Sequence, residues 1–149
     1  MLQVASEGQR ELCRGQGAEL RWARTPGPLT PPQVLDIFRK KTAPAFDVAL
    51  RIGALYAGLE RHEEVSRMLR TYSEALGIAY QIRDDLSDMG SQGETNDIAG
   101  LRPSLLLAVA FERAKGDQRV LLESMWGRTA EARANLRQIE ALYTELKAD

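Results

Sequence analysis

Proline and glycine are concentrated in a few short segments of this 149-residue chain, and long helix-forming stretches lie between them. The clearest break is Thr25-Pro26-Gly27-Pro28, because proline cannot continue a helix and glycine destabilises one. Thr30, which Pro31 and Pro32 follow, is typical of a helix N-cap with proline in the first turn. We find no convincing strand alternation and no internal repeat. This punctuation predicts an all-α fold.

The helix signals predict a bundle of about five helices with short connections. We expect the helices at residues 2–23, 31–60, 63–90, 97–115 and 118–146. The first should be interrupted near Gly15, the second should kink at Pro44, and Asp97 or a neighbour should cap the fourth. A chain of 149 residues is long enough for one domain with a core, so we predict a single domain over residues 1–149.

The composition argues against several functional classes. The formal net charge is −1, with acidic and basic residues interspersed, which does not suggest a nucleic-acid partner. A single cysteine, Cys13, rules out an internal disulfide framework and a cysteine-based zinc site. Residues 1–10 lack a signal-peptide pattern, and the longest apolar run, residues 105–111, is too short for a transmembrane segment. We therefore expect a soluble, cytoplasmic protein.

The helix expected at residues 63–90 has an apolar stripe and an acidic stripe on opposite sides. The apolar stripe consists of Val65, Leu69, Tyr72, Leu76, Ala79 and Leu86. Arg70, Glu74 and Gly77 lie on the side of the acidic stripe. Because the side opposite the core of a small bundle is normally solvated, we expect the apolar stripe to be buried and the acids to face water.

The acidic stripe itself comprises Gln81, Asp84, Asp85 and Asp88, whose spacing places them along one line of a helix. Aligned carboxylates repel one another, and a divalent cation with oxygen ligands would offset that repulsion. One interpretation is therefore a magnesium site that grips a diphosphate. The other is a solvated acidic helix face.

Two further segments carry polar groups suited to phosphate. Lys41-Thr42 ends a basic turn that could neutralise phosphate oxygens, although its lysines could equally pair with acids. In residues 97–105, Arg102 could bind phosphate near a helix N-terminus, where the helix dipole favours an anion. The alternative for this segment is a capping stretch with a surface arginine.

The order and spacing of these segments resemble the C-terminal half of the trans-isoprenyl diphosphate synthases, the polyprenyl synthetase family. Residues 77–88 resemble its second aspartate-rich motif, and Lys41-Thr42 resembles its Lys-Thr pair. Residues 97–105 resemble its Asp-x-x-x-x-Lys-Pro-Thr-Leu segment, and residues 12–20 its Gly-Gln-x-x-Asp helix. Arg102, Ser104 and Glu19 replace the family's lysine, threonine and aspartate. The resemblance implies part of an isoprenoid-synthase fold.

The resemblance also implies a prenyltransferase that condenses an allylic prenyl diphosphate with isopentenyl diphosphate. Its Mg²⁺ ligands would be the three carboxylates Asp84, Asp85 and Asp88. Its substrate-binding residues would be the polar side chains Lys41, Thr42, Gln81 and Arg102. The groups implied in catalysis are Asp84, Asp85 and Lys41.

The family carries its first aspartate-rich motif and its isopentenyl diphosphate site in an N-terminal half, and these 149 residues contain no second Asp-Asp pair. We therefore expect this chain alone to be inactive or incomplete, and to form a homodimer or associate with a second chain. One alternative is a non-catalytic helical module derived from a synthase, which associates with itself or with another chain. Another is a class I terpenoid cyclase.

Overall fold

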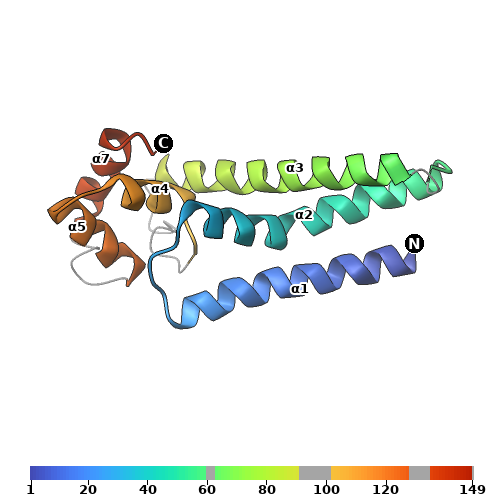
Figure 1. The fold of residues 1–149 in the computed structure, drawn as a ribbon, viewed down its shortest axis with the longest axis horizontal. Helices are drawn as coiled ribbons and strands as arrows, with labels where there is room; N and C mark the ends of the chain where they lie inside the picture. The colour runs from blue at the N-terminus through green and yellow to red at the C-terminus, as the bar shows by residue number, and fades with distance from the viewer. Residues whose placement is uncertain (60–62, 91–101, 128–134, 149) are drawn as a thin grey trace. The chain divides into compact units, whose positions relative to one another are not determined.

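The computed structural model describes residues 1–59, 63–90, 102–127 and 135–148, without the side chains of residues 88–90 and 136. These residues form six helices and no strand, which confirms the all-α prediction (Figure 1). The helices are α1 (Leu2–Arg24), α2 (Pro31–Tyr56), α3 (Glu63–Gly90), α4 (Leu105–Arg113), α5 (Asp117–Trp126) and α7 (Leu136–Glu145). No helix in the described ranges is long and apolar enough to cross a bilayer.

The chain divides into two compact units, each made from two separate stretches of sequence. Unit 1 comprises Met1–Ala18 and Leu35–Ile82, and unit 2 comprises Glu19–Val34 and Arg83–Asp149. The helices α1, α2 and α3 each contribute residues to both units. The prediction of a single domain over residues 1–149 stays a prediction.

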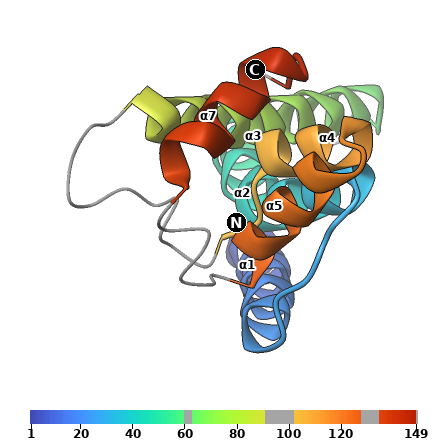
Figure 2. The same ribbon diagram turned by 90° about the vertical axis from the view of Figure 1, so that its left-hand side faces the viewer.

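In unit 1, α2 lies between α1 and α3, and glycines set the close approaches between the helices (Figures 1 and 2). A Cβ atom on Gly15 of α1 would overlap the backbone carbonyl of Lys40 on α2. A Cβ atom on Gly77 of α3 would lie 2.7 Å from the backbone nitrogen of Ala43, closer than real Cβ contacts. The expected interruption of the first helix near Gly15 is therefore wrong: α1 is continuous, and the glycine serves close packing.

The ends of α2 follow local sequence signals. At its start the side chain of Gln33 accepts a hydrogen bond from the backbone N–H of Thr30 (2.8 Å), which is one half of a capping box and fits the predicted N-cap. At its end Gly58 has φ of 75°, and Leu59 N–H donates to the carbonyl of Ala54 (2.9 Å). This Schellman arrangement ends α2 at Tyr56, before the predicted residue 60, and Pro44 lies inside the helix.

Unit 2 contains most of the fully buried apolar residues. Its short helices α4, α5 and α7 pack against one another (Figure 2). Trp126, 2% exposed, lies edge-on to Trp22, with 5.8 Å between the ring centroids. The indole N–H of Trp22 donates to the carbonyl of Gly27 (3.0 Å), which ties the predicted Thr25–Pro28 break to this core.

Two predicted helices of unit 2 differ from the structure. The fourth begins at Leu105 and not near Asp97, because Arg102 precedes a proline that disfavours helical geometry and Ser104 is the N-cap. Asp97 itself lies outside the described residues. The expected helix at residues 118–146 is not continuous, since α5 ends at Trp126 with Gly127 as its C-cap and α7 begins after Asn135.

The prediction that the apolar stripe of α3 is buried is wrong for several of its residues, whereas Asp84 of the acidic stripe is exposed as expected. On the stripe expected to be buried, Tyr72 is 57% exposed and Leu86 43% exposed. The buried positions are instead Ser73, 1% exposed, and Gly77. Small residues occupy the packed face because they let the backbone of α3 approach α2 closely. At Gly77 the contact with α2 depends on the absence of a side chain and not on hydrophobicity.

The pair Gly15 and Gly17 offers a test of this packing. Replacing Gly17 with alanine adds a Cβ with nothing within 4 Å, so the gain in helix propensity should raise the free energy of unfolding by about 0.5–1 kcal/mol. Replacing Gly15 with alanine brings the same propensity gain and a clash with Lys40, and should lower stability by about 1–3 kcal/mol. Urea unfolding of both variants measures the difference, and equal stabilities would contradict the close approach.

Candidate functional site

Two adjacent aspartates of α3, both in unit 2, have contrasting environments. Asp84 is exposed and makes no hydrogen bond or ion pair with the residues that the structure describes. Asp85 is half-buried, and its Oδ2 atom accepts three hydrogen bonds from the start of α4. The side chain of Asp88, the third predicted metal ligand, lies outside the described residues. The acidic stripe therefore contains at least two kinds of carboxylate.

The three donors to Asp85 Oδ2 are consecutive in sequence. They are the backbone N–H of Leu105 (2.6 Å), the hydroxyl of Ser104 (3.2 Å) and the backbone N–H of Leu106 (3.2 Å). The N–H of Leu107 donates to Ser104 Oγ (3.2 Å). The first three amides of α4 therefore already have acceptors, and the interpretation of Arg102 as a phosphate-binding residue stays a prediction. Arg102 is exposed and precedes the N-cap by two residues.

Tyr143 of α7 lies in the core of the same unit and is 3% exposed. Burial raises the pKa of its phenol, and the nearby negative charges of Asp85 and Glu140 raise it further. The fold therefore favours the neutral phenol.

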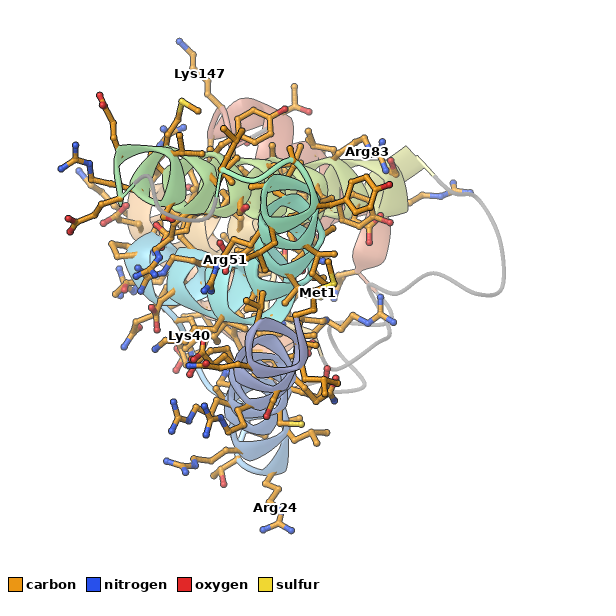
Figure 3. All side chains as sticks on the ribbon, turned by 90° about the vertical axis from the view of Figure 1, so that its right-hand side faces the viewer. Met1, Arg24, Lys40, Arg51, Arg83 and Lys147 are labelled. Atoms are coloured by element: carbon orange, nitrogen blue, oxygen red, sulfur yellow. The ribbon has the colours of Figure 1, made fainter. Side chains whose placement is uncertain are left out.

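The other predicted site residues belong to unit 1. Lys41 and Thr42 on α2 and Gln81 on α3 are half-buried. The two basic residues before Lys41 pair with an acid, as the alternative interpretation of this turn predicted. Lys40 (Figure 3) and Arg39 form ion pairs with Asp36 at the surface of α2, at 2.5 and 2.6 Å. Hydrogen bonds from these side chains lower the pKa of the Asp36 carboxyl, and the bond from Lys40 contributes more than the bond from Arg39.

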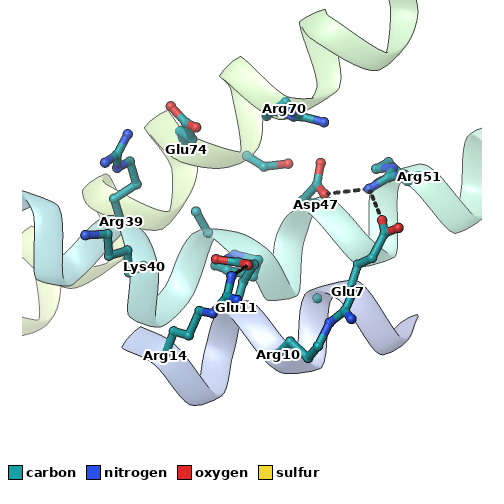
Figure 4. A pocket seen from close by; sticks show the side chains of 14 residues that line it. Glu7, Arg10, Glu11, Arg14, Arg39, Lys40, Asp47, Arg51, Arg70 and Glu74 are labelled. Carbon is teal, nitrogen blue, oxygen red and sulfur yellow. Dashed lines mark hydrogen bonds and ion pairs between the residues drawn. The ribbon is translucent and has the colours of Figure 1, made fainter. Parts of the chain in front are cut away.

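Unit 1 also contains a cavity of about 610 Å³ lined by residues of α1, α2 and α3 (Figure 4). None of the predicted site residues lines it. Its lining carries six basic side chains and four acidic ones. Arg51 pairs there with both Asp47 (3.4 Å) and Glu7 (3.6 Å), so part of this charge is neutralised within the cavity.

The donor set of the acidic stripe is compatible with magnesium. Within the described residues no three acidic, histidine or cysteine side chains form a metal-binding group. Magnesium, however, is commonly held by one or two carboxylates together with substrate phosphates and water. The exposed oxygens of Asp84 have the chemistry such a site needs.

Residues 1–143 match the family model described as polyprenyl synthetase. The chain belongs to the polyprenyl synthetase family. It is 30% identical over 118 residues to a geranylgeranyl diphosphate synthase of Methanosarcina mazei, covering 75% of this chain and 36% of that protein. It is 29% identical over 132 residues to a short chain isoprenyl diphosphate synthase of Methanothermobacter thermautotrophicus, covering 85% of this chain and 40% of that protein.

The fold of this polyprenyl synthetase family member also matches a solved structure, a decaprenyl diphosphate synthase from Rhodobacter capsulatus. The TM-score is 0.84 at 24% identity, and the match covers 99% of this chain and 46% of that one. The chain thus spans about two-fifths of the length of the curated relatives named above.

The contact between Asp85 and Ser104 was not found from the sequence, although a signal for part of it exists. A Pro-Ser pair directly before the apolar run of residues 105–111 is typical of an N-cap. The burial of Glu19, which is 5% exposed, was not predicted from the sequence either.

Tyr143 allows a test of its environment in this family member by pH. A raised pKa in the folded state adds stability that is fully present below the ordinary tyrosine pKa of about 10 and is lost as pH rises above it. Above pH 10 the wild-type protein should therefore lose up to about 1.4 kcal/mol per pH unit more than Tyr143→Phe. Urea unfolding at several alkaline pH values measures this, with Tyr72→Phe as the exposed control. Parallel profiles for wild type and Tyr143→Phe would contradict the assignment.

Proposed function

We propose that this polyprenyl synthetase family chain binds the allylic prenyl diphosphate of a prenyltransferase that uses isopentenyl diphosphate as the second substrate. The observation that supports this most is the exposed carboxylate of Asp84, which has no partner among the described residues and belongs to the segment resembling the second aspartate-rich motif. A carboxylate that is not used by the fold is available to a cation and its phosphate ligands.

The proposed cation is Mg²⁺, held by the carboxylates of Asp84 and Asp88. Bound magnesium would supply positive charge that stabilises a leaving diphosphate. The spacing of Asp84 and Asp88, four residues apart on α3, puts both on one side of the helix. Two such carboxylates are enough for magnesium when substrate oxygens complete its shell.

The remaining predicted residues would act on the diphosphate directly. Lys41 and Arg102 would neutralise its oxygens, and Thr42 and Gln81 would donate hydrogen bonds to it. In the proposed reaction the allylic C–O bond breaks and its electron pair leaves with the diphosphate. The alkene of isopentenyl diphosphate then forms the new C–C bond, and a proton is lost. The task of these side chains is to stabilise the departing negative charge.

We propose the complete reaction for an assembly that is larger than this chain. The relatives named above are about two and a half times as long as the portion that this chain matches. The resemblance assigns the first aspartate-rich motif and the isopentenyl diphosphate site to the part without a counterpart here. We therefore propose that this chain alone binds diphosphate but does not complete catalysis.

Binding can be tested without catalysis. A ligand at 100 times its Kd stabilises the native state by about 2.7 kcal/mol, so Mg²⁺ with a non-reactive allylic diphosphate analogue should raise the melting temperature by several degrees. Asp84→Asn should remove most of that shift, whereas Glu123→Gln, an exposed acid on α5, should leave it unchanged. An absent shift for the wild type at saturating ligand would refute the proposed function.

The second candidate function is a self-associating helical module, and the exposed apolar face of α3 in unit 1 favours it. Met68 is 61% exposed and Tyr72 57% exposed, and Ala75 and Ala79 continue the same line. Together with Ile82 these residues repeat at spacings of four and three, the pattern with which two α-helices pack along a seam. A second copy of the chain, presenting the same seam, is the proposed occupant.

Sedimentation velocity over a range of concentrations tests this association. The wild-type protein should form a dimer, and the double variant Met68→Gln/Tyr72→Gln should shift it to monomer by removing apolar area from the seam. Val120→Gln is the matched control, since Val120 is 64% exposed on α5. A wild-type protein that stays monomeric at every concentration would contradict self-association.

A further inference from the structure

The carboxylate of Asp85 closes the N-terminus of α4. Its Oδ2 atom accepts hydrogen bonds from Ser104 Oγ (3.2 Å), Leu105 N (2.6 Å) and Leu106 N (3.2 Å). A carboxylate oxygen offers about two lone-pair positions, so three donors saturate it. An ion coordinated by the same oxygen would lie close to the positive ends of three N–H and O–H bonds. This oxygen is therefore committed to the fold.

The surroundings of Asp85 are those of a structural contact. Leu106 and Leu107, in the first turn of α4, are buried, and the Asp85 charge is close enough to the buried Tyr143 to affect the pKa of its phenol. Asp84, one residue earlier, is exposed, as expected for neighbours that point about 100° apart on a helix. The two carboxylates of the Asp-Asp pair therefore lie in different surroundings: Asp85 is bonded to the start of α4, and Asp84 is exposed to solvent.

The charge of Asp85 suits this position. The first amides of a helix lack intrahelical acceptors and carry the positive end of the helix dipole, so a carboxylate is favoured there. Hydrogen bonds to an ionised acceptor are shorter and stronger than neutral ones, in line with the 2.6 Å separation of Leu105 N and Asp85 Oδ2. Ser104 Oγ connects the two turns by donating to Asp85 and accepting from Leu107 N.

We propose that Asp85 is the anchor of α4, a positioning residue that ties the start of this helix to the end of α3, and that it is not a ligand of the cation that Asp84 is proposed to bind. The anchoring part stands on the hydrogen bonds alone. The assignment of Asp84 rests on the proposed function. The proposal replaces the prediction of Asp85 as a metal ligand with a structural role.

The test compares Asp85→Asn with Asp84→Asn, two neighbouring substitutions with the same change of charge. In the wild type, NMR should show downfield amide protons for Leu105 and Leu106, because charge-assisted hydrogen bonds deshield them. Asp85→Asn should shift both upfield, speed their hydrogen exchange at least tenfold and lower the melting temperature by several degrees. Asp84→Asn should leave all three unchanged. The reverse pattern would overturn the anchoring role.

A ligand titration tests the other half of the proposal. With Mg²⁺ and inorganic pyrophosphate as the probe, Asp84→Asn should weaken binding at least tenfold. Asp85→Asn should weaken it less than threefold at a temperature where the variant is folded. A loss of binding in Asp85→Asn with unchanged Leu105 and Leu106 amides would show that Asp85 is a metal ligand and would refute the proposal.

Ser104→Ala keeps the proposal testable if Asp85→Asn does not fold. It removes one donor to Asp85 and the acceptor for Leu107 N–H, so the Leu107 amide should exchange faster while the downfield shifts of Leu105 and Leu106 remain. Uniformly fast exchange of all three amides in the wild type would overturn the anchor. Absence of pyrophosphate binding by the wild type would instead count against the proposed function and leave the exchange result intact.

Discussion

Every α-helix begins with backbone N–H groups that have no acceptor inside the helix, and α2 and α4 meet this demand in different ways. At the start of α2 the demand is met locally, because Pro31 and Pro32 have no N–H and the carbonyl of Thr30 accepts from Gln33 and Val34. At the start of α4 it is met by Ser104 together with a carboxylate about twenty residues earlier, Asp85. One acid of the predicted stripe, Asp85, thereby becomes part of the hydrogen bonding of the fold.

This difference explains what the sequence could predict and what it could not. The bounds of α3 and the beginning of α2 depend on residues close in sequence, and they were predicted to within a residue or two. The start of α4 was misplaced because its cap was sought at Asp97, whereas Pro103 and Ser104 determine it. The partner of Asp85 depends on a contact between distant segments, which no local pattern encodes.

The burial of α3 shows a second limit of pattern reading. An apolar stripe indicates the core only when bulky side chains mediate the packing. Here the contact between α3 and α2 is made where Gly77 meets Ala43, and bulkier residues such as Tyr72 remain exposed. Hydrophobic residues are common on protein surfaces, so an apolar stripe alone does not identify the buried face. The buried positions Ser73 and Gly77 lie four residues apart on another side of the helix.

The same packing gives meaning to the apolar face that remains exposed. A chain of this length buries a smaller fraction of its surface than one more than twice as long, and its relatives are that much longer. Met68 and Tyr72 are exposed along a regular seam and not scattered, which is the arrangement expected of a surface that another helix covers.

Asp84, by contrast, is exposed beside an anchored neighbour, so its carboxylate is held by a helix end that Asp85 fixes. An exposed apolar seam and a carboxylate without a partner among the described residues support different proposals, the first a protein partner and the second a cation. Both proposals thus rest on residues of α3 at different positions around the helix, and substitutions at Tyr72 and Asp84 can separate them.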